Sequence, residues 1–447
     1  MLFPITTICL ICCLAWTYFQ DGRRSALLLA LSTWAAEIVL MTIPIFHYRV
    51  GYSVSADMFV AASLFAVTVG YFVIRHEPIE SPASSSNIRG EAIVANWLAL
   101  LGIIGSLLLL ADARSRGTQV SLSYLLNNLS TIRAAVFDNL AQTTSHTAVV
   151  GSYLAPCSFL SIIAAAKLGR AGGRLLTFLA STSFVLVAIA GLFVYGGRTV
   201  LFCVISLLGI SLYLGGKRIF TVTPKRLILA VLVVVGVWYF SVSWLNTREG
   251  KINTEAILLN TQRAEYRPWI APIARRNDAV GTALISLGYF SSPLPTLSFY
   301  VQQPSRPGPF WGGYSYPLAA RTLGKLTGQY GPERWFQIRA EIFAPLESAG
   351  YAGNVWGTWL RDLLVDFGYV GTVLYCFVFG AFMAWVRNHF ERTGELHYHY
   401  LEVLACFTLA FGAFQSVVWY TFMANAFFVA VAIMLAVRAR PSLDKRL

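Results

Sequence analysis

Long apolar runs recur along most of the chain, and each has about the length, roughly 20 residues, that a membrane-crossing helix needs. The runs lack the residue-by-residue alternation of the shorter strands that build membrane barrels. The pattern therefore predicts an all-α polytopic membrane protein. We expect the first run to be a retained span, because no basic residue precedes it as in a cleaved signal peptide. The expected spans, about 11 in all, lie near residues 2–19, 25–46, 54–74, 92–111, 146–166, 175–195, 199–214, 226–244, 364–386, 400–418 and 421–437.

Two polar stretches between the runs are long enough to fold by themselves. Apolar residues at helical spacing within 112–145 predict an amphipathic helix on the outer membrane surface. Segment 245–363 is too long for a simple connection, and its aromatic residues and Pro-Gly turns argue against disorder. We therefore expect three regions: 1–244 with about eight spans, a large external loop 245–363 between spans 8 and 9, and 364–447 with the last spans and the tail.

Composition narrows the class of protein. Hydrophobic residues make up 56% of the chain and charged residues 12%, against about 25% charged in a typical soluble domain. This excludes a soluble enzyme and a disordered chain. The net charge of +13 comes from basic residues that flank the apolar runs, which is typical of orientation signals rather than of nucleic-acid binding. The seven cysteines fall inside apolar runs and show no metal-site or disulfide spacing.

The distribution of Lys and Arg predicts the orientation of the spans. One alternate set of connections, which includes 167–174 and 215–226, carries far more basic residues than the other set. Such connections stay in the cytoplasm, so the N-terminus is expected outside and the C-terminus inside. Segment 245–363 is then outside, because long segments cross the membrane largely regardless of their charge.

Arginines are the main candidates for binding an anion. Segment 245–363 is rich in arginine, whose planar guanidinium can bind phosphate through two N–H groups. This surface suits an anionic lipid head group such as a diphosphate, and a solvated face with scattered ion pairs is the alternative. Arg198 follows Gly196 and Gly197, which allow close backbone approach, at the expected outer end of a span. An arginine that only extends to the membrane interface is the alternative there.

The stretch 350–371, GYAGNVWGTWLRDLLVDFGYVG, opens the ninth expected span. We expect its helix to begin near 355–358, with Asn354 as the N-cap. Asp362 and Asp366 are then four residues apart on one helix face, beside Arg361. A carboxylate that enters the apolar layer is costly unless it is paired, which indicates a functional role. Acidic residues that merely complement a helix N-terminus are the alternative.

Two more carboxylates are candidate bases. Glu341 lies on a predicted amphipathic helix whose apolar face carries Trp335, Ile338 and Ile342, and a solvated helix charge is the alternative. Glu37 lies in the middle of the second span, where it could act in catalysis or pair with a polar neighbour. No histidine occurs between 245 and 363, which excludes a histidine base inside that segment. The sequence also lacks GxSxG and P-loop patterns.

Two motifs resemble those of a known family. GGRT at 196–199, GNVWGTWLRDLLVDFGYVG at 353–371 and the single large external loop make the chain similar to the Wzy-type oligosaccharide repeat unit polymerases. These enzymes serve the synthesis of O-antigen, capsule and exopolysaccharide. The resemblance covers most of the chain at the level of architecture. It implies a GT-C-like membrane glycosyltransferase in the bacterial inner (cytoplasmic) membrane, with the external regions in the periplasm.

The resemblance also implies an activity and a site. A growing glycan is transferred from undecaprenyl diphosphate onto a new lipid-linked repeat unit at the periplasmic face. The implied partners are undecaprenyl-diphosphate-linked oligosaccharides, membrane lipid, a flippase and a chain-length regulator, without nucleic acid, metal or cofactor. The candidate catalytic residues are Asp366, Asp362 and Glu341. The candidate diphosphate-binding residues are Arg198, Arg321, Arg339 and Arg361, supported by Gly196, Gly197 and Asn354.

Two other functions remain as alternatives. The first is an O-antigen ligase or another lipid-linked glycosyltransferase, which the absence of histidine from 245–363 disfavours. The second is a transporter or flippase for a lipid-linked sugar. A transporter is expected to place ionisable residues along a path through its helices. The expected spans hold only four acidic candidates, Glu37, Asp57, Asp366 and Glu402, which favours chemistry at the outer face.

Overall fold

The chain divides into two compact units, and both are mostly helical. The first unit comprises Met1–Glu77, Gly250–Trp385 and Cys406–Thr421, and the second comprises Pro78–Glu249, Val386–Ala405 and Phe422–Leu447. The computed structural model describes residues 4–22, 25–49, 51–75, 87–115, 145–195, 199–215, 255, 258–259, 263–303, 308–315, 332–350, 357–415 and 421–439.

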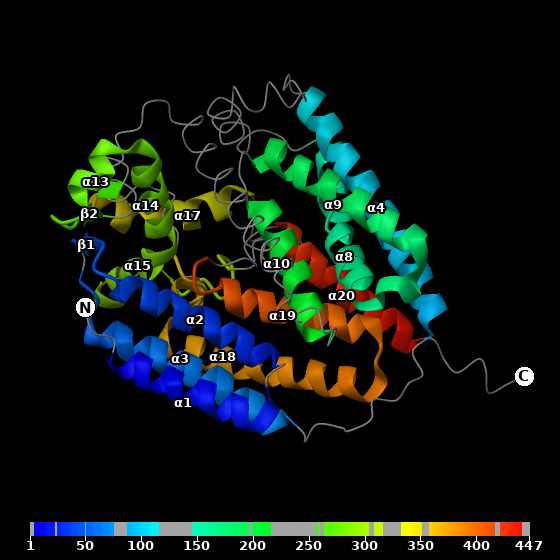
Figure 1. The fold of residues 1–447 in the computed structure, drawn as a ribbon, viewed down its shortest axis with the longest axis horizontal. Helices are drawn as coiled ribbons and strands as arrows, with labels where there is room; N and C mark the ends of the chain where they lie inside the picture. Colours follow the sequence, from blue (N-terminus) through cyan, green and yellow to red (C-terminus); the bar gives the residue numbers. More distant parts are fainter. Residues whose placement is uncertain are drawn as a thin grey trace, which may run out of the picture. The chain divides into compact units, whose positions relative to one another are not determined.

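The first unit begins with three packed helices, α1 (Pro4–Asp21), α2 (Ala26–Thr42) and α3 (Val54–Ile74) (Figure 1). The buried carboxylate of Asp57, in the first turn of α3, accepts the backbone N–H groups of Ile5 at 3.1 Å and Thr6 at 3.0 Å. These amides open α1 and have no intrahelical acceptor. Asp57 therefore caps α1 and holds it against α3, which is a structural role for this acidic residue.

The predicted external segment is folded where the structure describes it. Strand β1 (Phe46–Tyr48) pairs antiparallel with β2 (Ala264–Tyr266), and Phe46 lies opposite Tyr266. Helices α13 (Ala271–Arg276), α14 (Asp278–Ser291), α15 (Pro293–Gln302) and α17 (Pro332–Ser348) follow. Apolar side chains of the two strands and of α13 form a common core. The expectation that aromatic residues keep 245–363 ordered is confirmed for these elements, which gather at one end of α1–α3 (Figure 1).

Helix α18 (Trp359–Thr393) carries the ninth expected span and bends at Gly368, whose φ is 68°. Its backbone touches that of α3 at two glycines. A Cβ atom would lie 2.0 Å from the Phe377 oxygen at Gly70, and 2.0 Å from the Val67 oxygen at Gly380. Any larger residue would therefore separate the two helices. Helix α19 (Leu396–Phe411) follows α18.

The second unit is built around α4 (Ile88–Ser115), which packs against α7 (His146–Leu154), α8 (Cys157–Leu168) and α9 (Gly173–Tyr195). The short 3-10 helix η1 (Gly169–Gly172) joins α8 to α9, and α10 (Thr199–Leu214) lies against both. Asn425 of α20 (Thr421–Ala439) donates its side-chain N–H to the Ser152 carbonyl at 2.7 Å. The expected span 146–166 is broken into α7 and α8 just before Cys157, because Pro156 cannot donate a helical hydrogen bond.

The helices agree with a multi-pass membrane protein. Among the described residues, four helical stretches are long and apolar enough to cross a membrane: Val54–Ile74, Ile88–Ser115, His146–Leu192 and Trp359–Thr393. Ala26–Thr42, Thr199–Leu214 and Phe422–Arg438 are apolar but shorter. The expected spans other than 226–244 coincide with helices, whereas 226–244 and residues 116–144 of the predicted amphipathic segment lie outside the described part. The number of 11 spans and the GT-C architecture stay predictions.

Two expected spans are longer than their helices. The second, 25–46, ends as α2 at Thr42 because the chain continues into β1. The tenth, 400–418, ends as α19 at Phe411. There Trp34 Nε1 donates to the Leu409 carbonyl and Thr33 Oγ1 to the Ala410 carbonyl, both at 2.9 Å. Side chains of α2 thus satisfy the last carbonyl groups of α19, which have no partner within that helix.

Candidate functional site

The candidate site is built on the first turns of α18, all within the first unit. Thr358 precedes the helix, and its Oγ1 accepts the backbone N–H of Arg361 at 3.2 Å. Thr358 is therefore the N-cap. The helix begins at Trp359, one residue after the expected start near 355–358, and Asn354, the expected cap, lies outside the described residues.

Arg361 and Asp362 form a buried ion pair in this turn. Arg361 Nε and Nη2 lie 2.9 Å and 2.8 Å from Asp362 Oδ1, and the two residues are 4% and 3% exposed. Gly357 lies directly against the guanidinium, since a Cβ atom there would be 2.3 Å from Arg361 Cζ. A buried ion pair is weak evidence for stability, because removing two charges from water costs about as much as their attraction returns. Its presence in an apolar bundle is better explained by a functional role.

Aromatic rings from segment 245–363 cover this ion pair. Arg361 Cζ lies 5.9 Å from the ring centre of Tyr300 in α15 and 5.7 Å from that of Phe343 in α17. The Tyr300 hydroxyl donates to the Ile342 carbonyl of α17. Burial raises the pKa of the Tyr300 phenol above its usual range, and the nearby Arg361 charge acts in the opposite direction. The site thus combines a cation with electron-rich ring faces in a desolvated setting.

Asp366 holds a neighbouring loop through hydrogen bonds. Its fully buried carboxylate accepts the backbone N–H of Tyr314 at Oδ1, at 3.0 Å, and that of Ser315 at Oδ2, at 2.7 Å. Its backbone carbonyl accepts the N–H of Trp311 at 3.0 Å. Asp362 and Asp366 precede the bend at Gly368 and are one helical turn apart, as expected. They nevertheless have different partners: Asp362 holds an arginine, and Asp366 holds the loop 308–315.

Of the remaining predicted site residues, two lie on α17 and the others lie outside the described residues. Glu341 lies on α17 and is exposed, while Ile338 and Ile342 of the same helix are fully buried, so the predicted amphipathic helix is confirmed. Arg339 lies on α17, one turn before Phe343. Arg198, Gly196, Gly197, Arg321 and Asn354 lie outside the described residues.

Sequence reasoning missed Tyr300, Thr358 and the loop around Tyr314, which complete the surroundings of Arg361 and Asp366. Aromatic residues in the arginine-rich segment 245–363 were a visible signal for Tyr300, since cations pack on aromatic faces. Nothing in the sequence links Tyr314 to Asp366, because the contact is through the backbone N–H, which every residue type but proline has.

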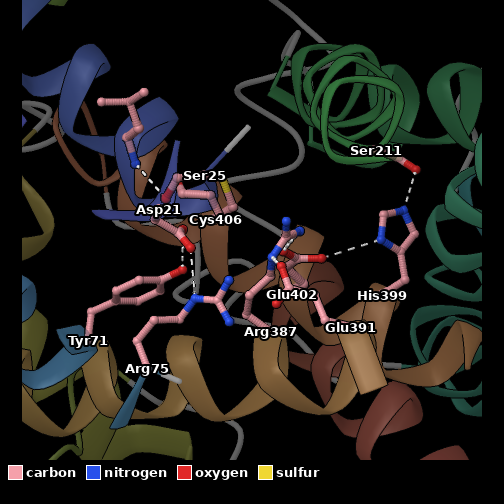
Figure 2. Close-up of polar contacts among 12 residues, drawn as sticks. Asp21, Ser25, Tyr71, Arg75, Ser211, Arg387, Glu391, His399, Glu402 and Cys406 are labelled. Atoms are coloured by element: carbon pink, nitrogen blue, oxygen red, sulfur yellow. Dashed lines mark hydrogen bonds and ion pairs between the residues drawn. The ribbon is translucent and has the colours of Figure 1, made fainter. Parts of the chain in front are cut away.

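Two other buried polar clusters are drawn in Figure 2. In the first unit, Asp21 accepts the Tyr71 hydroxyl at 2.6 Å and pairs with Arg75 at 2.7 Å. In the second unit, Arg387 pairs with Glu402 at 2.8 Å, and Glu402 lies 3.5 Å from His399. Glu402, one of the acidic residues considered for the transporter interpretation, thus forms an ion pair with an arginine of its own unit.

No protein-family model, no curated protein and no solved structure matches the chain. In the part of the chain that the structure describes, no group of three or more His, Cys, Asp or Glu side chains is placed to hold a metal ion.

Proposed function

We propose that the chain is a polysaccharide polymerase of the bacterial inner membrane. It transfers a growing glycan from undecaprenyl diphosphate onto a new lipid-linked oligosaccharide repeat unit at the periplasmic face. The reaction forms a bond from a sugar hydroxyl of the new unit to the anomeric carbon of the chain. The bond from that carbon to the diphosphate breaks, and the electron pair leaves with undecaprenyl diphosphate. One of the candidate carboxylates Asp366, Asp362 or Glu341 accepts the hydroxyl proton.

One observation carries the proposal: α17, which bears Arg339, packs through Phe343 on buried Arg361 at the start of a membrane-length helix. Two of the four predicted diphosphate-binding arginines thus belong to elements in direct contact. Fixed cations stabilise a departing diphosphate most strongly where water is excluded, because the local dielectric is low. The pair with Asp362 engages two of the five donors of the guanidinium and fixes its plane.

The charge pattern supports the location. The basic connections predicted on the cytoplasmic side leave the segment with α13–α17 outside, where lipid-linked repeat units arrive after transport. The single large segment and the buried arginine at its junction with a span suit a reaction at that interface.

A deletion strain tests the function through the gel pattern of its surface polysaccharide. A polymerase deletion gives a lipid core that carries one repeat unit, since ligation continues without elongation. A ligase deletion gives a bare core with long lipid-linked chains, and a flippase deletion gives a bare core without them. Either of the last two patterns contradicts the proposal.

A further inference from the structure

The first unit contains a group of buried polar and aromatic residues beside α2, which we call the polar corner. Its members are Trp34 and Glu37 of α2, Tyr48 of β1, Phe290 and Ser291 of α14, Trp359 of α18 and the segment 409–414. Contacts connect these members into a closed ring, and the ring contains two buried polar groups that have no hydrogen-bond partner among the described residues.

The ring begins and ends at α2. Trp34 Nε1 donates to the Leu409 carbonyl at 2.9 Å, and the Gly412 carbonyl accepts the backbone N–H of Trp359 at 2.8 Å. The segment 409–414 is therefore joined both to α2 and to the first residue of α18, two residues before Arg361.

The other half of the ring runs through α14. The rings of Phe414 and Phe290 meet edge to face, with centres 5.2 Å apart. The next residue, Ser291, shares a hydrogen bond of 2.5 Å with the Tyr48 hydroxyl. Burial raises the pKa of the Tyr48 phenol, and the hydrogen bond with Ser291 acts in the opposite direction. Helix α14 itself packs against α2, the helix that carries Glu37, which closes the ring.

Glu37 shares the buried face of α2 with Trp34, three residues earlier, and is five residues before the end of the helix, roughly 8 Å along its axis. Its side chain is 0% exposed, and neither carboxylate oxygen has a partner among the described residues. The same holds for Nε1 of Trp359, which is also 0% exposed. The corner therefore holds an unpartnered acceptor and an unpartnered donor.

Unpartnered buried polar groups destabilise a fold, because each has lost its hydrogen bonds to water. Native proteins keep few of them, and each one calls for an explanation such as a functional role or a bound water or ion. Aromatic side chains with a few polar groups among them form the usual lining of a ligand site. Such a lining suits a polyhydroxylated ring, whose hydroxyls both donate and accept while its C–H face packs on aromatic rings.

We propose that the polar corner binds a sugar of the lipid-linked repeat unit, with Glu37 and the Trp359 indole N–H hydrogen-bonding to its hydroxyls. The inference rests on the proposed function for the identity of the sugar. Because Trp359 directly precedes the turn with Arg361, a sugar bound here lies beside the diphosphate-binding arginine.

Binding of two separate probes tests this assignment with the full-length protein in lipid nanodiscs. The first probe is the repeat-unit oligosaccharide, released from its lipid by mild acid, and the second is undecaprenyl diphosphate. Glu37→Leu and Trp359→Phe are each expected to weaken oligosaccharide binding about 5–10-fold, the effect of one hydrogen bond. Both variants should bind undecaprenyl diphosphate as the wild type does.

Three matched variants guard against loss of folding. Glu37→Gln keeps size and part of the hydrogen-bonding capacity, so it should retain more oligosaccharide affinity than Glu37→Leu. Trp359→Phe keeps the ring that packs on Tyr375 and Phe379. Trp16→Phe changes a tryptophan that stacks on Phe72, away from the corner, and should have no effect.

Two results would overturn the sugar site: wild-type protein that does not bind the oligosaccharide, or Glu37→Leu and Trp359→Phe variants that bind it as tightly as the wild type. Elongation of lipid-linked repeat units by the wild type in the same nanodiscs tests the proposed function separately. If elongation occurs but the variants bind normally, the sugar site is wrong and the polymerase assignment stands. If elongation fails while binding depends on Glu37 and Trp359, the reverse holds.

Discussion

The buried charged side chains of the two units differ in whether they have partners. In the second unit, Arg387 lies 2.8 Å from Glu402 and 2.7 Å from Glu391, Glu402 lies 3.5 Å from His399, and His399 Nε2 lies 3.0 Å from Ser211 Oγ. Each charged residue of this cluster lies within ion-pair distance of another side chain of the same unit, although Glu402 Oε2 and His399 Nδ1 have no hydrogen-bond partner among the described residues (Figure 2). The first unit contains matched groups too, but it also keeps Glu37, whose oxygens have no hydrogen-bond partner among the described residues.

The difference separates structural polar groups from candidate ligand groups. A network whose members satisfy one another rigidifies the helices that carry it and leaves little for a ligand. A buried carboxylate without a partner adds no such rigidity and weakens the fold. We therefore associate the proposed ligand binding with the first unit, where Arg361 and Glu37 lie, and the positioning of α18 and α19 with the Arg387 cluster of the second unit.

The largest expected effect comes from Arg361. Arg361→Ala leaves Asp362 buried without its partner, which typically costs about 3–5 kcal/mol of stability. The variant also removes a side chain that we propose binds the diphosphate. We expect no detectable polymer and a lower unfolding temperature of the purified protein.

The double variant Arg361→Met with Asp362→Leu separates these two losses. Replacing a buried ion pair by apolar residues of similar volume often leaves stability unchanged or improved. The double variant should therefore reach normal protein levels and still make no polymer in a gel of surface polysaccharide. Normal polymer from it would show that the ion pair is structural, like the cluster of the second unit.

Asp366→Asn should have the next largest effect. The amide keeps one acceptor oxygen, so one of the two N–H groups of Tyr314 and Ser315 loses its charged partner, at about 1.5–3 kcal/mol. We expect faster proteolytic cleavage within 308–315 and shorter polymer. A positioned general base would instead cost about 10²–10⁴-fold in rate with the loop intact.

Glu341→Gln is the matched control for Asp366→Asn, because Glu341 is an exposed carboxylate on α17. It should change neither cleavage nor polymer length if it is only a solvated charge. Loss of polymer from Glu341→Gln alone would make Glu341 the base and Asp366 an anchor for the loop.

Glu402→Gln tests whether the Arg387 cluster of the second unit affects stability or polymerisation. Breaking its buried pair with Arg387 should lower the unfolding free energy by about 3–5 kcal/mol and reduce the amount of protein in the membrane. Polymerisation per molecule of folded protein should remain within about twofold of the wild type, measured in nanodiscs. The control is Glu395→Gln, an exposed partner of His397, which should cost at most about 1 kcal/mol. Altered polymer length at a normal protein level would link the Arg387 cluster to function.

The smallest expected effect comes from a pair of glycines. Gly368 has a φ of 68° and open space where a Cβ atom would lie, so Gly368→Ala introduces backbone strain of about 1–2 kcal/mol without a clash. Gly209 also has open space but an ordinary helical φ, and Gly209→Ala should stabilise α10 by about 0.5–1 kcal/mol. Unfolding temperatures that move in the same direction for both variants would contradict the role of the bend at Gly368.

The apolar runs predicted most helices of the fold, because a run of membrane length is long enough to form one helix by itself. The run 54–74 coincides with α3 residue for residue. Helix ends were predicted less well. The ends of α2 and α19 depend on β1 and on hydrogen bonds from Thr33 and Trp34, which join residues far apart in the sequence.

The candidate site was predictable only in part. The i, i+4 spacing of Asp362 and Asp366 predicted their shared helix face, since it depends on local geometry alone. Their partners could not be predicted: Asp366 binds backbone N–H groups some fifty residues earlier in the chain. Glu37 was recognised as a buried acid from its place in an apolar run, but whether a neighbour pairs with it depends on the packing of α2, α14 and α18.

The pairing of β1 with β2 has a consequence for how the protein is made. Ala264 follows Tyr48 by 216 positions, so β1 leaves the ribosome well before its partner strand. At about 5–20 residues per second, the wait is roughly 10–40 s. During that time the strand edge formed by Phe46, His47 and Tyr48 has backbone groups available to other extended chains. Biogenesis of this protein therefore includes an interval in which a chaperone that shields strand edges would increase the yield.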